Sequence, residues 1–297
     1  MSVPAQSFQF TKQLRATLTL GAPGAQFAGT GDNTLIVENL RMNATIQAVV
    51  RFAAQLDLRI YGMRQEDMNA LTVLFFGPTP SVQLNNTVTL EANSGNGWTQ
   101  VFFGTIVQGS PDYRGIPNVP FHIQGRFGYF AGITPGLPLS YPNGASAVSA
   151  LQTVANALNV TLENNGVTAM LPAGSYFPGA PWTQLRTICH AANVDFYTEP
   201  GLLVICPKGQ PRTSSAPVTV SPTSGLIGYP RIEVGGIGLD VLYSTAIVQA
   251  GRLTVSGSDV PAANRTWMPY ALTHSLESWQ PSGLWQSSVH CMWAGES

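Results

Sequence analysis

The chain has 297 residues, and its hydrophobic fraction of 44% is ordinary for a globular protein and excludes a disordered one. Only 10% of the residues are Asp, Glu, Lys or Arg, against about 25% in typical soluble domains. The formal net charge of −1 argues against a dedicated nucleic-acid binder. The scarcity of charge favours a subunit that is covered in a permanent assembly, with a secreted β-protein as the alternative.

The lack of a signal peptide and the pattern of cysteines predict a protein that folds in a cytosol. Residues 1–10 lack the basic segment and apolar run of a signal peptide. No stretch approaches the about 20 apolar residues that a membrane span requires. The three cysteines, Cys189, Cys206 and Cys291, are an odd number without CxxC spacing. We therefore interpret them as reduced structural thiols.

The first region reads as a series of strands with one short helix. Gly-rich turns and alternating apolar residues predict strands at residues 8–20, 33–37 and 44–50. A strand at 56–61 places Leu56, Leu58 and Ile60 on one face. Near-helical spacing of apolar residues then predicts a short helix over 65–74.

A β-hairpin follows at residues 82–107, turning at 93–97. Its second arm is apolar on both faces, with Val101, Phe103 and Val107 on one and Phe102 and Ile106 on the other. Such a strand is buried on two sides, and we interpret the second side as a contact with another subunit. A strand at 119–125 contains Pro120, which predicts a sheet edge. We expect residues 1–130 to form a first β-barrel domain, either a closed barrel or a half-barrel, with one short helix.

A duplicated module follows the Pro- and Gly-rich segment 131–144. Leu151, Thr153, Val154, Ala157, Asn159 and Val160 recur 34 residues later as Leu185, Thr187, Ile188, Ala191, Asn193 and Val194. Each copy, near 146–171 and 181–206, is expected to contain a helix, a strand, a turn and a return strand that pairs with the first. The helices are predicted at 146–158 and 182–192, with Pro181 suited to a first helical turn. The predicted αββ module spans residues 131–211.

Strands resume in the last region, residues 212–297. They are predicted at 232–234, 239–243, 246–249, 252–256, 266–270, 272–278 and 284–292. The run 246–257 loosely resembles 53–62, which indicates two related domains. The predicted fold is mainly β with an α+β insert, namely two β-barrel domains flanking the duplicated αββ module.

No arrangement of reactive residues predicts an enzyme, a metal site or a cofactor site. The four histidines, His122, His190, His274 and His290, lack metal-binding spacing. Helical spacing places Cys189 in a core with His190 pointing away, which disfavours a thiol nucleophile. The serine-hydrolase and phosphate-binding motifs are absent from the sequence, and Gly236-Ile237-Gly238 is interpreted as a turn or bulge.

Glu277, beside Trp279 and Trp285, is the strongest candidate acid for a glycan site. Alternation places Glu277 on the polar face of a strand, and the tryptophans suit a subunit interface equally well. No catalytic residue is therefore assigned. A carbohydrate-binding or glycan-hydrolysing β-protein remains an alternative function.

Three segments resemble a known family. They are LDLRIYGMRQEDMN (56–69), NNTVTLEA…WTQVFFGTIVQ (85–108) and LTHSLES…PSGLWQSSV (272–289). With the module between them, they are similar to the baseplate hub proteins of contractile-tailed bacteriophages. The resemblance implies two tail-tube-like β-barrel domains per subunit and a homotrimer that adapts a six-fold tail tube to a three-fold spike. It implies no catalytic residues, and the lysozyme-like domain associated with some hubs is not found in this sequence.

The expected partners are further copies of the chain, the tail tube protein, the spike protein and other baseplate proteins. DNA is expected to pass through the central channel during genome ejection without sequence-specific binding. The expected location is the tail baseplate of the virion, after synthesis in the host bacterial cytoplasm. The sequence leaves the subunit-interface residues open, and it does not separate this reading from a tail-tip hub of a non-contractile phage.

Overall fold

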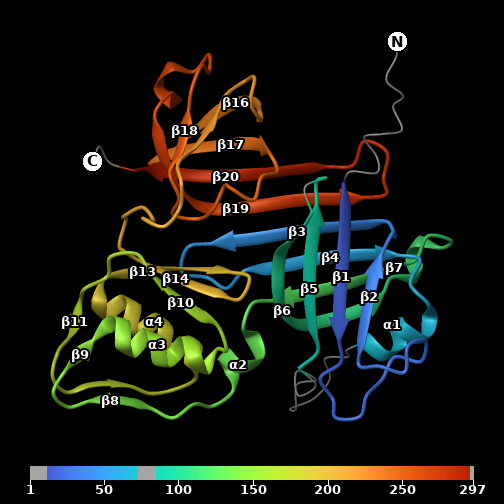
Figure 1. Cartoon of the computed structure of the whole chain (residues 1–297), viewed down its shortest axis with the longest axis horizontal. Helices are drawn as coiled ribbons and strands as arrows, with labels where there is room; N and C mark the ends of the chain where they lie inside the picture. Colours follow the sequence, from blue (N-terminus) through green and yellow to red (C-terminus); the bar gives the residue numbers. More distant parts are fainter. Residues whose placement is uncertain (1–11, 73–84, 96, 295–297) are drawn as a thin grey trace. The chain divides into compact units, whose positions relative to one another are not determined.

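The computed structural model describes residues 12–72, 85–95 and 97–294 (Figure 1). The chain divides into two units. The first unit contains residues 1–47, 54–130 and 274–285, and the second unit contains 48–53, 131–273 and 286–297. Most elements are strands and the few helices are short, so the predicted mainly β class is confirmed. The predicted domain boundaries at residues 130 and 211 stay a prediction.

An antiparallel sheet forms the body of the first unit. Its strands are β1 (Gln13–Thr19), β2 (Thr34–Glu38), β3 (Met42–Val49), β4 (Gln55–Tyr61), β5 (Thr87–Asn93), β6 (Trp98–Pro111) and β7 (Pro120–Arg126). Their order is β3-β4-β7-β6-β5-β1-β2, and helix α1 (Gln65–Leu71) follows β4. As predicted, Leu56, Leu58 and Ile60 share a buried face. Predicted residues 8–11 and 73–84 lie outside the described residues.

Two expectations about this sheet are corrected. β7 is not an edge strand, because it pairs with β4 on one side and β6 on the other. Pro120 is tolerated there because it is the first residue of the strand, and its carbonyl accepts a hydrogen bond from the Asp112 backbone N–H. Among the described strands of the unit no pairing joins β2 to β3, so this sheet does not close into a barrel.

The module of the second unit contains the two longest helices among the described residues, α3 (Ala147–Ala157) and α4 (Pro181–Ala192). It also contains α2 (Tyr129–Ile133), which begins in the first unit. Its strands are β8 (Leu139–Tyr141), β9 (Ala145–Ser146), β10 (Thr161–Asn164), β11 (Met170–Leu171), β12 (Ser175–Phe177), β13 (Val194–Glu199) and β14 (Leu202–Pro207). The repeat is visible in this structure, because Leu151 of α3 and Leu185 of α4 are fully buried in one core.

The two copies of the repeat differ after their helices. In the second copy β13 and β14 form the predicted antiparallel hairpin, whereas in the first copy β10 pairs in parallel with β14 and β11 pairs with β9. The predicted hairpin of the first copy is therefore wrong. The Asn164 side chain explains the difference. Its amide oxygen accepts a hydrogen bond from the Val167 backbone N–H, and its amide nitrogen donates one to the Val167 carbonyl, so the chain is held in a loop.

In the sheet β10-β14-β13, strands β13 and β14 are buried on both faces. Leu203 and Ile205 of β14 pack into the helical core, while Val204 and Cys206 pack with Ala250 and other residues of the following β segment. The alternation of side chains along a strand produces this division. It accounts for the nearly uninterrupted apolar run of β14.

The second β region comprises residues 212–273 and 286–294. The strands that belong to it wholly or in part are β15 (Val218–Val220), β16 (Leu226–Glu233), β17 (Gly236–Leu242), β18 (Leu253–Val255), β19 (Thr266–Ser278) and β20 (Trp285–Trp293). β17 lies between β16 and β20, and β18 lies between β15 and β19. Ile237, Leu239 and Val289 are fully buried in its core.

Three expectations for this region are corrected. Residues 246–249 form a turn rather than a strand, since the Ile247 N–H bonds the Ser244 carbonyl and Ala250 has φ of 56°. The strands predicted at 266–270 and 272–278 are one strand, β19. Gly236 begins strand β17 rather than lying in a turn or bulge. A Cβ atom there would clash with the Cys291 carbonyl oxygen, so the close approach of β20 requires glycine.

Candidate interaction surfaces

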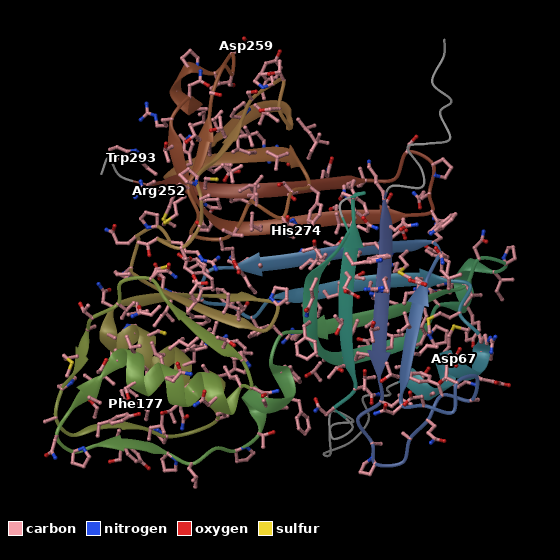
Figure 2. The ribbon with its side chains drawn as sticks, viewed as in Figure 1. Asp67, Phe177, Arg252, Asp259, His274 and Trp293 are labelled. Atoms are coloured by element: carbon pink, nitrogen blue, oxygen red, sulfur yellow. The ribbon has the colours of Figure 1, made fainter. Side chains whose placement is uncertain are left out.

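The four histidines lie on four separate elements, β7, α4, β19 and β20. His122 on β7 contacts Asp57, with 2.7 Å between Nε2 and Oδ2, and His290 on β20 contacts Glu233, with 2.8 Å between Nδ1 and Oε2. Burial lowers the pKa of His274, on β19, to about 4 (Figure 2). Within the described ranges no group of three or more His, Cys, Asp or Glu residues could hold a metal ion.

All three cysteines are free and buried, as expected for structural thiols. Cys189 is 3% exposed in the helical core, and burial raises the pKa of its thiol to about 12. His190, the next residue, is exposed on α4. Burial therefore keeps the Cys189 thiol protonated at neutral pH.

The candidate acid Glu277 serves the turn between β19 and β20. Its Oε2 accepts hydrogen bonds from the Leu284 backbone N–H at 3.0 Å and from the Gln280 side-chain amide at 3.2 Å. Trp285 is largely buried and donates its indole N–H to the Ser94 hydroxyl at 2.9 Å, whereas Trp279 is 40% exposed. The geometry gives Glu277 a capping role in the hairpin.

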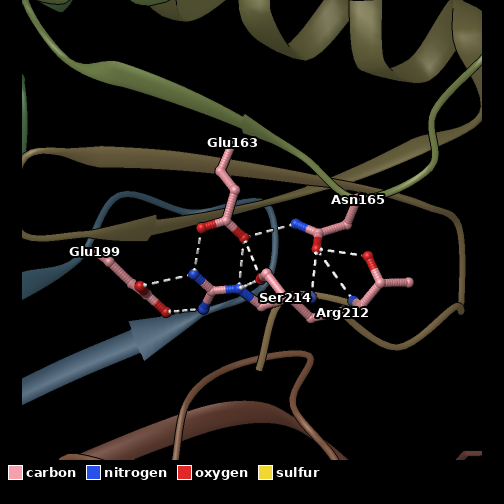
Figure 3. Close-up of polar contacts among 6 residues, drawn as sticks. Glu163, Asn165, Glu199, Arg212 and Ser214 are labelled. Carbon is pink, nitrogen blue, oxygen red and sulfur yellow. Dashed lines mark hydrogen bonds and ion pairs between the residues drawn. The ribbon is translucent and has the colours of Figure 1, made fainter. Parts of the chain in front are cut away.

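An ion-pair cluster at Arg212, which the sequence analysis missed, joins the module to the second β region (Figure 3). Arg212 is 7% exposed and its guanidinium contacts the carboxylates of both Glu163 and Glu199. The Nε–Oε1 distance to Glu163 is 2.7 Å, and the Nη1–Oε1 distance to Glu199 is 2.6 Å. The hydrogen bond from Arg212 lowers the pKa of Glu163 to about 2.

Backbone groups complete this cluster. The side-chain oxygen of Asn165 accepts hydrogen bonds from the backbone N–H groups of Thr213 and Ser214, at 3.0 and 3.1 Å. Residues 212–214 are thus held against β10 and the start of the loop that follows it (Figure 3). We call this cluster, Glu163, Asn165, Glu199 and Arg212 with Ser214, the Arg212 junction. It fixes the segment through which the chain enters the second β region.

β16 ends the sheet of the second β region and exposes apolar side chains. Across the sheet, Ile232 of β16 lies opposite Ile237 of β17, which lies opposite Cys291 of β20. Ile237 and Cys291 are buried, whereas Ile232 is 63% exposed. The row of apolar side chains is therefore buried on β20 and β17 but exposed to solvent on β16.

Further apolar side chains are exposed near this edge, and the charged side chains there pair with side chains of the same sheet. The exposed set comprises Tyr229, Ile232, Val234, Leu242 and Trp293 (Figure 2 labels Trp293, at the end of β20). Arg231 pairs with Asp240, and Glu233 pairs with His290. Free charges normally protect an exposed strand edge. This edge, which we call the β16 edge, carries its charges in pairs within its own sheet.

The apolar strand at 98–107 is only partly covered within this chain. Phe102 and Ile106 of β6 are buried, and Val101, Phe103 and Val107 on the other face are half-buried. The expected contact of that second face with another subunit stays a prediction. None of the helices that the structure describes is long and apolar enough to cross a membrane.

Comparisons with known proteins agree with the fold. The model of the family described as Baseplate hub gp41 matches residues 14–286. The fold is similar to that of the prophage MuSo2 43 kDa tail protein from Shewanella oneidensis, with a TM-score of 0.64, 9% identity, and 94% of this chain and 97% of that chain covered. A comparison with curated protein sequences finds no match.

Two further solved structures share the fold. The tail protein from Neisseria meningitidis MC58 has a TM-score of 0.61 and 11% identity, and the match covers 93% of this chain and 96% of that chain. The E. coli c3393 protein is a type VI secretion component described as structurally similar to T4 bacteriophage tail proteins gp27 and gp5. It has a TM-score of 0.58 and 10% identity, with coverage of 94% and 77%.

Proposed function

The chain belongs to the baseplate hub gp41 family, and from this membership we propose that three copies form a hub that adapts a six-fold tail tube to a three-fold spike. The protein is a structural component of a phage tail baseplate and not an enzyme. In the proposed trimer, the sheet of the first unit and the second β region act as two tail-tube-like domains. Three copies then present six similar β regions to the tube.

The β16 edge is the observation that carries this proposal. The row of apolar side chains that begins with the buried Cys291 and Ile237 ends at the exposed Ile232. Burying Ile232 against another strand would be favourable, because it removes apolar surface from water. Backbone groups along a sheet edge pair readily with another strand. We propose that a strand of a neighbouring copy covers this edge, so that sheets open in one chain are completed around the ring.

The proposed position of the ring also fixes its partners. The tail tube protein lies on one side, the spike protein on the other, and further baseplate proteins around the outside. The genome passes through the central channel during ejection. The formal net charge of −1 favours such passage, because a strongly basic wall would retain DNA.

Mass photometry of the purified chain tests the trimer. The expected species has three times the chain mass of 31.6 kDa, alone or after addition of purified tube or spike protein. Ile232→Lys is expected to return the protein to monomers, because the ammonium group would be buried unpaired at the contact. Ile232 is exposed in the single chain, so folding should be retained.

Met170→Lys is the matched control. Met170 is a 69% exposed apolar residue of β11, and its replacement adds the same charge away from the β16 edge. The control should remain trimeric. A wild-type protein that stays monomeric and binds neither the tube nor the spike protein would refute the hub assignment. A hub at the tip of a non-contractile tail would behave identically in this assay, and the absence of a sheath protein from purified particles would identify it.

A further inference from the structure

A groove on the second unit gathers positive charge in a chain that has little. The open cavity has a volume of about 490 Å³. Its lining includes Arg51, Phe52, Arg186, His190, Phe196 and Lys208, and we call it the basic groove. They come from the β3–β4 connection, helix α4, strand β13 and the segment after β14.

Hydrogen bonds hold one wall of the groove in place. The Arg51 backbone N–H donates to the Phe196 carbonyl at 2.9 Å, and its side-chain Nε donates to Asp195 Oδ1 at 2.6 Å. Thr198 donates its hydroxyl to the Phe52 carbonyl at 3.3 Å. Arg51 adopts φ of 66°, a conformation that a residue with a side chain keeps only where its surroundings impose it.

The segment after β14 is anchored through the same acid. The second oxygen of Asp195 accepts a hydrogen bond from the Gly209 backbone N–H at 2.9 Å. The Lys208 backbone N–H donates to the Asn193 carbonyl at 3.1 Å. Asp195 thus ties the β3–β4 connection to the segment after β14, and both of its oxygens are used in doing so. The groove is formed before any partner binds, as recognition sites generally are.

The charges of the basic groove are not balanced locally. Arg51 pairs with Asp195, but among the described residues no carboxylate pairs with Arg186 or Lys208. The chain has only 14 Lys and Arg residues, and three of them line this one groove. In a protein with so few charged residues, two cations without a counterion beside a concave surface indicate an anionic occupant.

The floor of the groove is apolar. Phe52 is 55% exposed, and the Arg186 guanidinium lies 5.9 Å from the centre of its ring. Phe196 and Val194 are buried beneath. A nucleic-acid backbone would use many cations and would not need this floor. A peptide that carries carboxylates next to an apolar side chain complements both features.

We propose that the basic groove binds an acidic segment of another tail protein, with carboxylates facing Arg186 and Lys208 and an apolar side chain on Phe52. The choice of a tail protein as partner rests on the proposed function, whereas the recognition chemistry does not. The contact would lie on the module and the β3–β4 connection, away from the β16 edge in the sequence and on different strands.

Fluorescence anisotropy with the full-length chain tests the recognition chemistry. The probe is a labelled peptide, Glu-Leu-Asp-Phe-Glu-Leu, and its matched control is Gln-Leu-Asn-Phe-Gln-Leu. We expect the acidic peptide to bind about tenfold more tightly than the amide peptide, equivalent to about 1.4 kcal/mol. Added salt should remove most of this difference.

Variants locate the binding. Arg186→Glu and Lys208→Glu should each weaken the acidic peptide about tenfold, and Phe52→Ser should weaken both peptides. Arg114→Glu is the matched control, because Arg114 is 90% exposed in the first unit and its loss changes the net charge equally. It should leave binding unchanged. Thermal unfolding of each variant confirms that it is folded.

Three outcomes would overturn the proposal. The first is equal binding of the acidic and amide peptides. The second is an equal loss in the Arg114→Glu control, which would show that bulk charge drives binding. The third is displacement of the peptide by a single-stranded DNA oligomer of equal charge that binds more tightly, which would identify a nucleic-acid groove. None of these results depends on whether the chain forms trimers, so failure here and failure of the hub assignment are distinguishable.

Discussion

The Arg212 junction and the basic groove are both built around arginine side chains of the second unit, and they use charge in opposite ways. Arg212 is 7% exposed and faces two carboxylates within its own chain. Arg186 and Lys208 line an open cavity, and among the described residues no acid pairs with them. A buried charge needs an opposite charge beside it, because it has lost its hydration. A charge at the surface is hydrated and so can remain unpaired until a partner binds. From this comparison we expect the Arg212 junction to stabilise the fold and the basic groove to bind an acidic partner.

The largest effect is expected from Arg212→Met. The substitution keeps an aliphatic chain of similar length but leaves Glu163 and Glu199 facing each other without a cation. Breaking a buried ion pair from one side costs about 3–5 kcal/mol. Both carboxylates are partly exposed, so the expected loss here is at the lower end, about 3 kcal/mol. Hydrogen exchange of the β10 and β13 amides at neutral pH measures the loss. A change below about 0.5 kcal/mol would remove the distinction between junction and groove.

A smaller effect is expected from acid. Glu163 has a pKa of about 2 in the folded chain and an ordinary value of 4.5, so its contribution to stability is fully present above about pH 4.5. That contribution is lost as the pH falls towards 2, because the unfolded chain then binds the proton more readily. The stability difference between wild type and Glu163→Gln should therefore narrow from pH 4.5 downward. Hydrogen exchange across this range measures it, and a constant difference would contradict the assigned cause.

The smallest effect on stability is expected from Arg186→Met. The substitution removes only the guanidinium lying 5.9 Å from the Phe52 ring, so the free energy of unfolding should change by no more than about 0.5 kcal/mol. Binding of the acidic peptide should nevertheless weaken. Hydrogen exchange measures the change in the free energy of unfolding, and fluorescence anisotropy measures the change in peptide affinity. A loss of stability above about 1 kcal/mol would show that Arg186 is a structural residue like Arg212.

Local periodicity was sufficient to predict much of the fold. The spacing of Leu151 and Leu185 predicted both module helices, and the alternation of Leu56, Leu58 and Ile60 predicted a buried strand. Pairing between distant strands leaves no such signal. The sequence therefore misled at β7, where Pro120 occupies the first position of an inner strand, and at β10, whose partner comes from the second copy of the repeat.

The candidate surfaces were harder to predict for the same reason. Arg212 lies in a segment rich in Pro and Ser, and its partner Glu163 is distant in sequence. The basic groove combines Arg51 with helix α4 and Lys208, which only the folded chain brings together. Low overall charge predicted a subunit covered in a permanent assembly, which stays a prediction, and it could not show where the remaining charges gather.

The path of the backbone between the two units has a mechanical consequence. Residues 48–53 belong to the second unit although they lie within the N-terminal stretch of the first, and residues 274–285 belong to the first unit although they lie near the C-terminus. Any single cut between 54 and 273 therefore yields two fragments that each contribute to both units. A nicked molecule can come apart only if both units unfold, so a single cleavage in that interval need not separate the fragments.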